Sequence, residues 1–288
     1  CLLPYRSIMI WIFSAFFLPI TRGMMQARAQ FRPLGFNMIF EGIGKLTLGI
    51  IFVYFGWRVY GAIAGIFLGG TIAFALSFLS LKDIIKTKEE KLERPEIYKY
   101  AKPAFLITFI VVFFYSIDII IARIFFSPEI VGSYAIASIL SKAIFWGTLP
   151  ISKAMFPLSA ENHSKKEKSN SVFYNSIFMV LMCVFSALSV FYFFPDFLTE
   201  TFAGKTVELA SGILIYLGVG TSLISIANLI LLYKLSLGKT KNYGYLIFPI
   251  IIEILLFVFF SKNVFQYSIA FITASAIFLF AAVTLMNE

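Results

Sequence analysis

The chain has 288 residues, of which 60% are hydrophobic and 14% are charged. Soluble domains carry about 25% charged residues, so this composition excludes a water-soluble fold of this size and predicts an integral membrane protein. The net charge of +9 does not indicate nucleic acid as a partner, because the basic residues lie in short gaps between apolar runs.

Apolar runs long enough to cross a membrane recur along the whole chain. A membrane-spanning helix needs about 20 mostly apolar residues. Nine runs are predicted as spans: 5–21, 36–55, 59–81, 102–125, 130–156, 171–195, 208–233, 243–260 and 264–286. Barrel strands would be about ten residues long and would alternate in hydropathy. These runs do neither, so the prediction is an all-α polytopic membrane helix bundle.

Basic residues are concentrated in every second gap between the predicted spans. One set of gaps holds sixteen lysines and arginines, and the other holds three, Arg58, Lys205 and Lys262. Because cytoplasmic loops are enriched in these residues, the first set and the C-terminus are expected in the cytoplasm. Residue 1 is then expected on the opposite, outer side of the membrane. An odd number of spans without a starting Met predicts that the N-terminal part of the first lobe is missing.

The longest polar gap predicts a boundary between two helix groups. This gap, residues 81–103, contains both acidic and basic residues as well as Pro95 and Pro103. We expect residues 82–102 to form a partly helical cytoplasmic linker. Residues 1–81 would then supply three spans, and residues 103–288 would supply six.

Two charged residues lie deep in the second predicted span. Glu41 and Lys45 are four residues apart and therefore share a helix face, where they can form an ion pair. Lys45 would lie ~15 Å into the span at ~1.5 Å per residue. The pair is interpreted either as a structural contact between helices or as part of a hydrated cavity in which Lys45 binds an anion.

The fourth span carries an acid within its apolar sequence. Asp118 has a short side chain and cannot reach the membrane surface, so it is expected to face the bundle interior and pair with a base from another helix. Arg123 lies near the end of the span and is expected to extend outward into the interface.

Four further polar residues are candidates in the later spans. Lys142 and Lys153 are eleven residues apart and share a face to within ~20°, which suggests a cationic track. Lys142 is expected to pair with Asp118 or with Glu253, the remaining deep acid. Asn228 could form hydrogen bonds between helices.

Histidine, cysteine, glycine and proline give weaker signals. One histidine and two cysteines argue against a catalytic triad or a metal site, and no cofactor is predicted. The spacing of glycines in 61–70 predicts close helix packing. Pro150 and Pro157 are expected to kink or end the fifth span.

Two stretches resemble a known family. Residues 24–65 and 100–161 resemble segments of the polysaccharide-export, or Wzx-type oligosaccharide, flippases, which share a superfamily with multidrug (toxin extrusion) transporters and lipid II flippases. The features that carry this resemblance are Pro103, Asp118, "VGSYA" at 131–135, "FP" at 156–157 and Ser159.

The resemblance implies a two-lobed transporter fold and a function. The implied activity is translocation of a lipid-diphosphate-linked oligosaccharide across the cytoplasmic membrane by alternating access, with membrane lipids and other polysaccharide-assembly membrane proteins as partners. A proton or sodium gradient could drive it through Asp118 or Glu253. The alternatives are a cation-coupled multidrug antiporter and a lipid II flippase. A membrane enzyme is disfavoured, because no acid–base constellation is evident.

Overall fold

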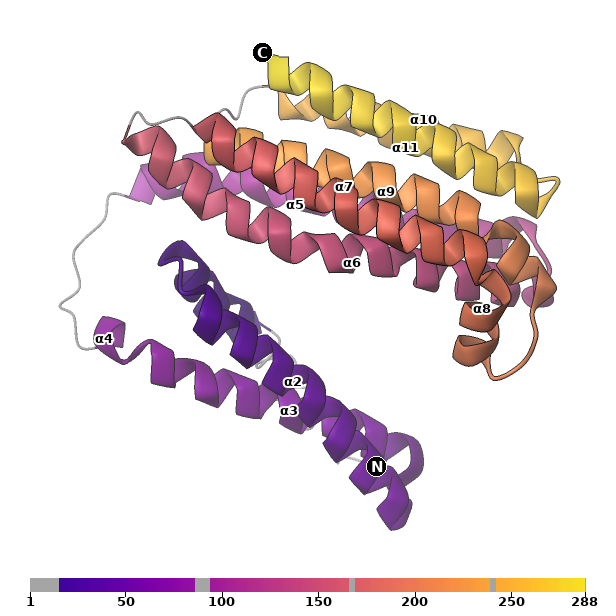
Figure 1. Cartoon of the computed structure of the whole chain (residues 1–288), viewed down its shortest axis with the longest axis horizontal. Coiled ribbons are helices and arrows are strands. Elements are labelled where there is room, and N and C mark those ends of the chain that lie inside the picture. Colours follow the sequence, from indigo (N-terminus) through magenta and orange to yellow (C-terminus); the bar gives the residue numbers. More distant parts are fainter. Residues whose placement is uncertain (1–15, 86–93, 166–168, 239–241, 288) are drawn as a thin grey trace. The chain divides into compact units, whose positions relative to one another are not determined.

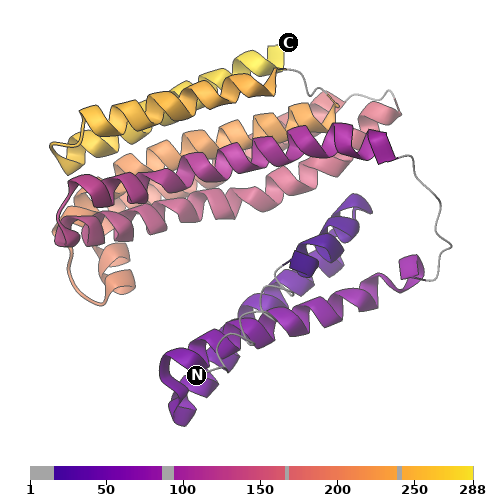
Figure 2. The ribbon, with the colours of Figure 1, turned by 180° about the vertical axis from the view of Figure 1, so that it is seen from behind.

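The computed structural model describes residues 16–85, 94–165, 169–238 and 242–287, and the regular elements in these ranges are all helices (Figure 1). The chain divides into two compact units, Cys1–Leu92 and Glu93–Glu288, which we call the N-terminal and C-terminal units. Figure 2 shows the helices of each unit from behind. The division falls within the predicted linker, residues 82–102.

The N-terminal unit contains a helical hairpin. Residues 16–27 are helical and are followed by α2 (Phe31–Phe52), a π-helical turn η1 (Val53–Trp57), α3 (Arg58–Ser80) and α4 (Lys82–Ile85). The chain reverses at the turn because Gly56 adopts a φ of +89° and Arg58 a φ of +46°. Glycine takes up such a φ without the steric cost that a Cβ atom imposes.

Glycines of α3 allow α2 and α3 to approach closely. Gly61, Gly65 and Gly69 recur at four-residue intervals, and all three are buried. A Cβ atom at Gly65 would lie 2.3 Å from the backbone nitrogen of Gly49, and one at Gly69 would lie 2.7 Å from that of Lys45. No side chain fits at these distances. The predicted packing role of this spacing is therefore confirmed.

The C-terminal unit is built around a central helix. Its elements are α5 (Arg94–Phe125), α6 (Pro128–Ser164), α7 (Ser169–Phe193), α8 (Pro195–Ala203), α9 (Glu208–Ser236), η2 (Tyr243–Leu246), α10 (Ile247–Phe259) and α11 (Val264–Asn287). Helix α9 packs against α6, α7 and α11 and is the most buried of the described membrane spans. Its position explains why residues all round this helix are buried, small hydroxyl residues as well as aliphatic ones.

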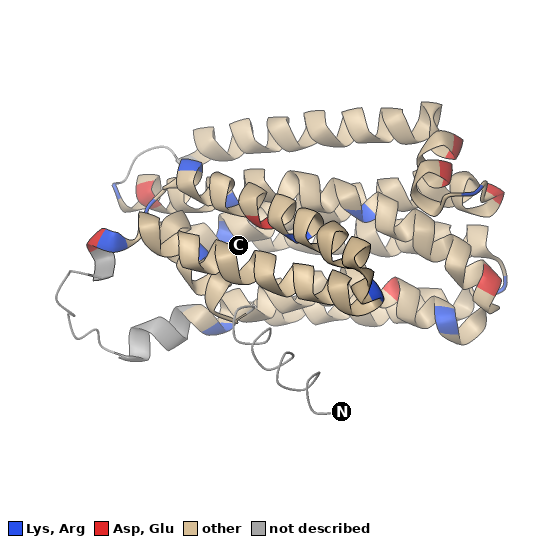
Figure 3. Cartoon of the chain, turned by 90° about the horizontal axis from the view of Figure 1, so that it is seen from below, with Lys and Arg blue, Asp and Glu red and all other residues tan. Residues whose placement is uncertain are grey.

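Aromatic side chains fill the interior of the C-terminal unit. Phe114 stacks on Phe278 with ring centroids 4.5 Å apart, and Phe257 stacks on Tyr267 at 4.3 Å. Many phenylalanines and isoleucines lie exposed on the outer faces of the helices, as expected for surfaces that contact lipid. Figure 3 shows that charged residues are sparse along the helices and more frequent towards their ends.

Six helical stretches in the described ranges are long and apolar enough to cross a membrane. One of them, Phe31–Ser80, contains the predicted span 36–55 and all but the last residue of the predicted span 59–81, because η1 joins α2 to α3. The predicted span 243–260 corresponds to the shorter apolar stretch Tyr243–Phe259. The predicted span 5–21 lies largely outside the described residues.

Two helices extend beyond the predicted spans. Helix α6 continues through Pro150 and Pro157 to Ser164, so neither proline ends the helix; a kink at these positions stays a prediction. Helix α5 begins at Arg94, so the predicted linker 82–102 is partly helical, as expected, and Pro103 lies inside α5 and not at its start.

Candidate functional site

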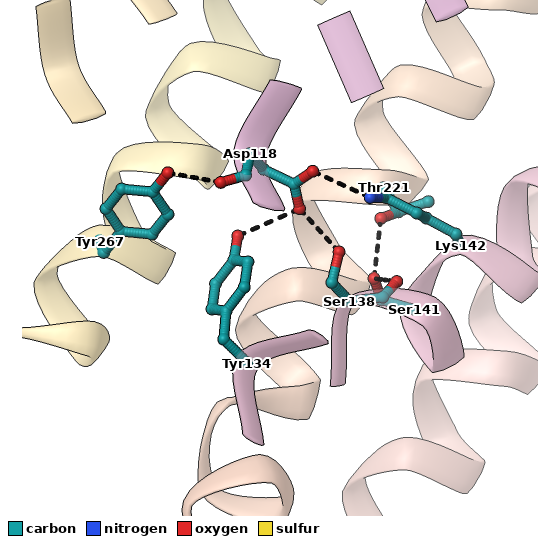
Figure 4. A network of polar contacts seen from close by, with 7 residues as sticks. All are labelled: Asp118, Tyr134, Ser138, Ser141, Lys142, Thr221 and Tyr267. Carbon is teal, nitrogen blue, oxygen red and sulfur yellow. Dashed lines mark hydrogen bonds and ion pairs between the residues drawn. The ribbon is translucent and has the colours of Figure 1, made fainter. Parts of the chain in front are cut away.

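Asp118 is the centre of a polar network inside the C-terminal unit (Figure 4). Its carboxylate oxygen Oδ1 forms an ion pair with Lys142 Nζ at 2.9 Å. The other oxygen, Oδ2, accepts hydrogen bonds from Ser138 Oγ at 2.6 Å and from the Tyr134 hydroxyl at 3.2 Å. These three donors are spaced four residues apart on α6 and so share one face. The predicted pairing of Asp118 with a base from another helix is confirmed.

Side chains from two more helices complete this arrangement. Tyr267 of α11 donates a hydrogen bond to the backbone carbonyl of Asp118 at 2.7 Å. Thr221 of α9 donates to Ser141 Oγ at 3.3 Å, and Ser141 donates to the carbonyl of Ser138 at 2.8 Å. Helices α5, α6, α9 and α11 are therefore joined through polar contacts in their apolar interior. We call these seven residues, drawn in Figure 4, the C-terminal network.

Lys142 is the member of the C-terminal network that reaches towards the surface of the unit. Its side chain is 12% exposed, whereas that of Asp118 is 1% exposed. The ammonium group also lies 5.8 Å from the centre of the Tyr115 ring, a cation–π distance. An ammonium group has three donors on a flexible stem. Lys142 is therefore the charged group of this network with the greater access to solvent.

A second network joins the helices of the N-terminal unit. Glu41 forms ion pairs with Arg22 at 2.8 Å and with Lys45 at 2.5 Å, so the predicted pairing of Glu41 with Lys45 is confirmed. Arg22 also donates to the side-chain oxygen of Asn37 at 2.8 Å, and Asn37 donates to the carbonyl of Ala73 at 2.6 Å. We call Arg22, Asn37, Glu41 and Lys45 the N-terminal network. With two bases and one acid, it has a formal excess of one positive charge.

The glycines of α3 make room for the Lys45 side chain. A Cβ atom at Gly69 would lie 2.8 Å from Lys45 Cγ, and one at Gly70 would lie 3.9 Å from its Cε. The aliphatic stem of the lysine thus follows the glycine surface of α3. The Lys45 side chain is 34% exposed, the largest exposure of the three charged groups in this network. Lys45 is therefore the charged group of this network with the greatest access to solvent.

The other predicted site residues lie outside these networks. Arg123 is exposed in the last turn of α5, as expected for a residue that extends outward. Lys153 is exposed on α6, and its role in a cationic track with Lys142 stays a prediction. Asn228 is buried in α9, and Glu253 is buried in α10. Lys142 binds Asp118 rather than Glu253.

Several members of the two networks were not predicted from the sequence. Arg22 is one of the sixteen basic residues in the gaps expected on the cytoplasmic side, although it contacts α2, and the role of Asn37 was not predicted. Tyr134 and Ser138 carried a usable signal, because they precede Lys142 at four-residue steps on one face of α6. Tyr267 had no such signal. Within the described ranges, no three potential metal-ligating residues of the His, Cys, Asp and Glu types lie together.

The bundle of long apolar helices with charged groups inside it is that of a multi-pass membrane protein. The crystal structure of a mutant of the Vibrio cholerae MATE transporter VcmN is similar over 97% of this chain and 68% of that chain, with a TM-score of 0.79 and 17% sequence identity. This likeness shows the fold. A family model described as polysaccharide biosynthesis protein matches residues 6–230, and the chain belongs to that family. No curated protein matches it. The resemblance noted in the sequence is thereby confirmed.

Proposed function

We propose that this protein translocates a lipid-diphosphate-linked oligosaccharide across the cytoplasmic membrane by alternating access. Membership of the polysaccharide biosynthesis family supports this class of substrate. The observation that carries the proposal is the presence of lysines within apolar helices that are paired with acids and still partly exposed, namely Lys45 and Lys142. Charged residues inside membrane spans are costly and mark substrate or ion pathways.

The chemistry of such a substrate fits these groups. An oligosaccharide headgroup carries many hydroxyl groups, and its transfer into hydrocarbon without hydrogen-bond partners costs several kcal/mol for each unsatisfied group. The diphosphate adds negative charge. Lys45, Arg22 and Lys142 supply donors and positive charge to the diphosphate, and Glu41 and Asp118 hold them in position when no substrate is bound.

The topology and partners follow from the same proposal. The protein is placed in the cytoplasmic membrane with its C-terminus in the cytoplasm, on the basis of the distribution of basic residues between its spans. It acts without a catalytic step and without a bound cofactor. Its partners are the lipid-linked glycan, membrane lipids and the other membrane proteins of polysaccharide assembly.

Charge-removing variants test this function in cells that lack the wild-type copy. Lys45→Met and Lys142→Met are expected to abolish surface export of the glycan, while the lipid-linked precursor accumulates on the cytoplasmic side. Lys262→Met is the matched control, since Lys262 is an exposed lysine in the loop before α11 and should retain full export. Immunoblots of the membrane fraction establish equal protein levels. Normal export by both network variants would contradict the proposal.

A further inference from the structure

Trp146 is a tryptophan exposed well inside a membrane-spanning helix. It lies in α6, ten residues from the nearer end of the predicted span 130–156, or ~15 Å at ~1.5 Å per residue. Its side chain is 58% exposed. Tryptophan in membrane proteins is enriched at the two interfaces with water, where the ring meets the lipid headgroups. An exposed indole at this depth therefore requires a different explanation from that of an interfacial anchor.

The face of α6 that carries Trp146 also carries two lysines. At 100° per residue, Lys142 lies ~40° and Lys153 ~20° from Trp146 around the helix axis. Lys153 is exposed, and the side chain of Lys142 is 12% exposed. Charged residues within membrane spans almost always face the bundle interior or a water-filled cavity, because contact with acyl chains is costly. We therefore infer that these three residues, which we call the lysine face of α6, do not contact lipid.

Neighbouring aromatic rings hold Trp146 in position. Phe145 meets it nearly at a right angle, with ring centroids 6.2 Å apart and 87° between the planes. Phe145 packs in turn against Tyr115 of α5 at 4.9 Å, and the Tyr115 ring centre lies 5.8 Å from Lys142 Nζ. Phe145 and Tyr115 are both buried. The exposed indole and the ammonium group are thus supported by the same pair of buried rings.

An exposed indole near an ammonium group fits one part of a lipid-linked glycan. A pyranose ring presents a row of C–H groups with partial positive charge on its apolar face. The face of an aromatic ring is electron-rich and attracts such groups, while the sugar hydroxyls at the edge stay in water. In a lipid-diphosphate-linked glycan the first sugar is bonded directly to the diphosphate. A diphosphate at Lys142 therefore brings this sugar to Trp146, about one helical turn away.

We propose that Trp146 is a sugar-binding residue, which stacks on the first pyranose ring of the substrate while Lys142 contacts the diphosphate. This inference rests on the proposed function and deepens it, because it separates the residue that recognises the sugar from those that bind the charge. Stacking does not depend on the pattern of hydroxyls at the edge of the sugar. Trp146 should therefore favour sugar-linked diphosphates in general over a lipid diphosphate without a sugar.

The first experiment asks whether Trp146 faces water or lipid. A variant with Trp146 as its single tryptophan, Trp11→Phe and Trp57→Phe, is reconstituted into nanodiscs with or without brominated acyl chains. A thermal unfolding curve like that of the wild type establishes that the variant is folded. We expect aqueous iodide to quench the fluorescence of Trp146 and brominated chains to leave it largely unchanged. Quenching by the brominated chains alone, or by neither agent, would overturn the proposal.

The second experiment measures the contribution of the sugar to binding. The probes are farnesyl diphosphate and its conjugates with N-acetylglucosamine, glucose and galactose, and each Kd is determined by calorimetry on the purified full chain in nanodiscs. We expect the conjugates to bind the wild type about two- to tenfold more tightly than farnesyl diphosphate. Trp146→Leu should lose this preference and keep the Kd of farnesyl diphosphate. Trp146→Tyr retains an aromatic face and should keep most of the preference.

Two further variants serve as controls for this measurement. Trp57→Leu is matched to Trp146→Leu, because Trp57 is 56% exposed but lies in the turn η1 and not on α6. It should keep the preference of the wild type for the conjugates. Lys142→Met should weaken the binding of the sugar-linked and the sugar-free probes alike, because both carry the diphosphate.

The outcomes separate this inference from the proposed function. Equal Kd values for all probes in the wild type, or an unchanged preference in Trp146→Leu, would overturn the assignment of Trp146. Binding of farnesyl diphosphate that depends on Lys142 would in that case leave the proposed function standing. A wild type that binds none of the four probes would contradict the proposed function itself, and the inference would fall with it.

Discussion

The Asp118–Lys142 ion pair gives the sharpest prediction on stability. The substitution Lys142→Met removes the positive charge of the side chain but keeps most of its aliphatic volume. Asp118 is then left with the hydroxyl groups of Ser138 and Tyr134 as its remaining side-chain donors. The reverse change, Asp118→Asn, leaves the ammonium group of Lys142 without its carboxylate partner. The two variants are not equivalent, because the side chain of Asp118 is 1% exposed and that of Lys142 is 12% exposed.

The expected magnitudes follow from this asymmetry. Removal of one partner from a buried ion pair costs about 3–5 kcal/mol, and we expect Lys142→Met to fall in this range. Asp118→Asn should cost less, about 1–3 kcal/mol, because the freed ammonium group can turn towards solvent and asparagine keeps a hydrogen-bonding oxygen. The double variant should cost less than the sum of the two, with an interaction energy of about 1–3 kcal/mol.

Reversible unfolding of the purified protein in mixed detergent micelles measures these values. Helicity by circular dichroism and tryptophan fluorescence should report the same transition, so that a two-state free energy of unfolding is defined. Lys262→Met serves as the control for removal of a lysine, with an expected change below ~0.5 kcal/mol. If Lys142→Met is no more destabilising than this control, or if the double variant is additive, the ion pair does not organise the interior as described.

Three further predictions concern other contacts. Gly65→Leu should prevent α2 and α3 from packing and should abolish the monodisperse peak in size-exclusion chromatography. Gly42→Leu is the control and should elute as the wild type does, because a Cβ atom at Gly42 meets nothing within 4 Å. Similar profiles for the two variants would contradict the close approach of α2 and α3. Asn37→Leu should lower the free energy of unfolding by about 1–3 kcal/mol, since it removes a buried bond to a carbonyl of α3, and an unchanged value would argue against the N-terminal network. Lys234→Met removes a hydrogen bond from the lysine to the backbone carbonyl of Leu285. Amide hydrogens at the end of α11 should then exchange with solvent about tenfold faster than in the wild type. Equal exchange rates would show that this contact does not stabilise the end of the helix.

The helices, and the contacts between residues on one helix face, could be predicted from the sequence. Hydropathy predicts most spans, because the membrane requires every backbone polar group to be satisfied inside its own helix. The contact of Glu41 with Lys45 follows from their four-residue spacing alone. The cost of burying Asp118 also predicts a base on another helix, although it does not choose between candidate bases.

Contacts between distant segments could not be predicted in the same way. Arg22 meets Glu41 only because helix 16–27 packs beside α2, and its place in the sequence is equally typical of a cytoplasmic loop. Tyr267 meets Asp118 across 149 residues. Glu253 is a related case, since the hydropathy pattern of α10 gives no indication that this acid has no hydrogen-bond partner among the described residues. These features depend on tertiary packing, which residue spacing does not contain.

Movement of a charged lipid between leaflets is the most direct measurement of the central claim. Purified protein is reconstituted into liposomes with a fluorescent polyprenyl diphosphate-linked sugar, and the label in the outer leaflet is bleached by an impermeant reductant. With the wild type we expect nearly all of the label to become accessible, while Lys45→Met and Lys142→Met leave the inner leaflet protected, as in protein-free vesicles. Equal bleaching with the wild type and both variants would contradict a cationic path for the diphosphate.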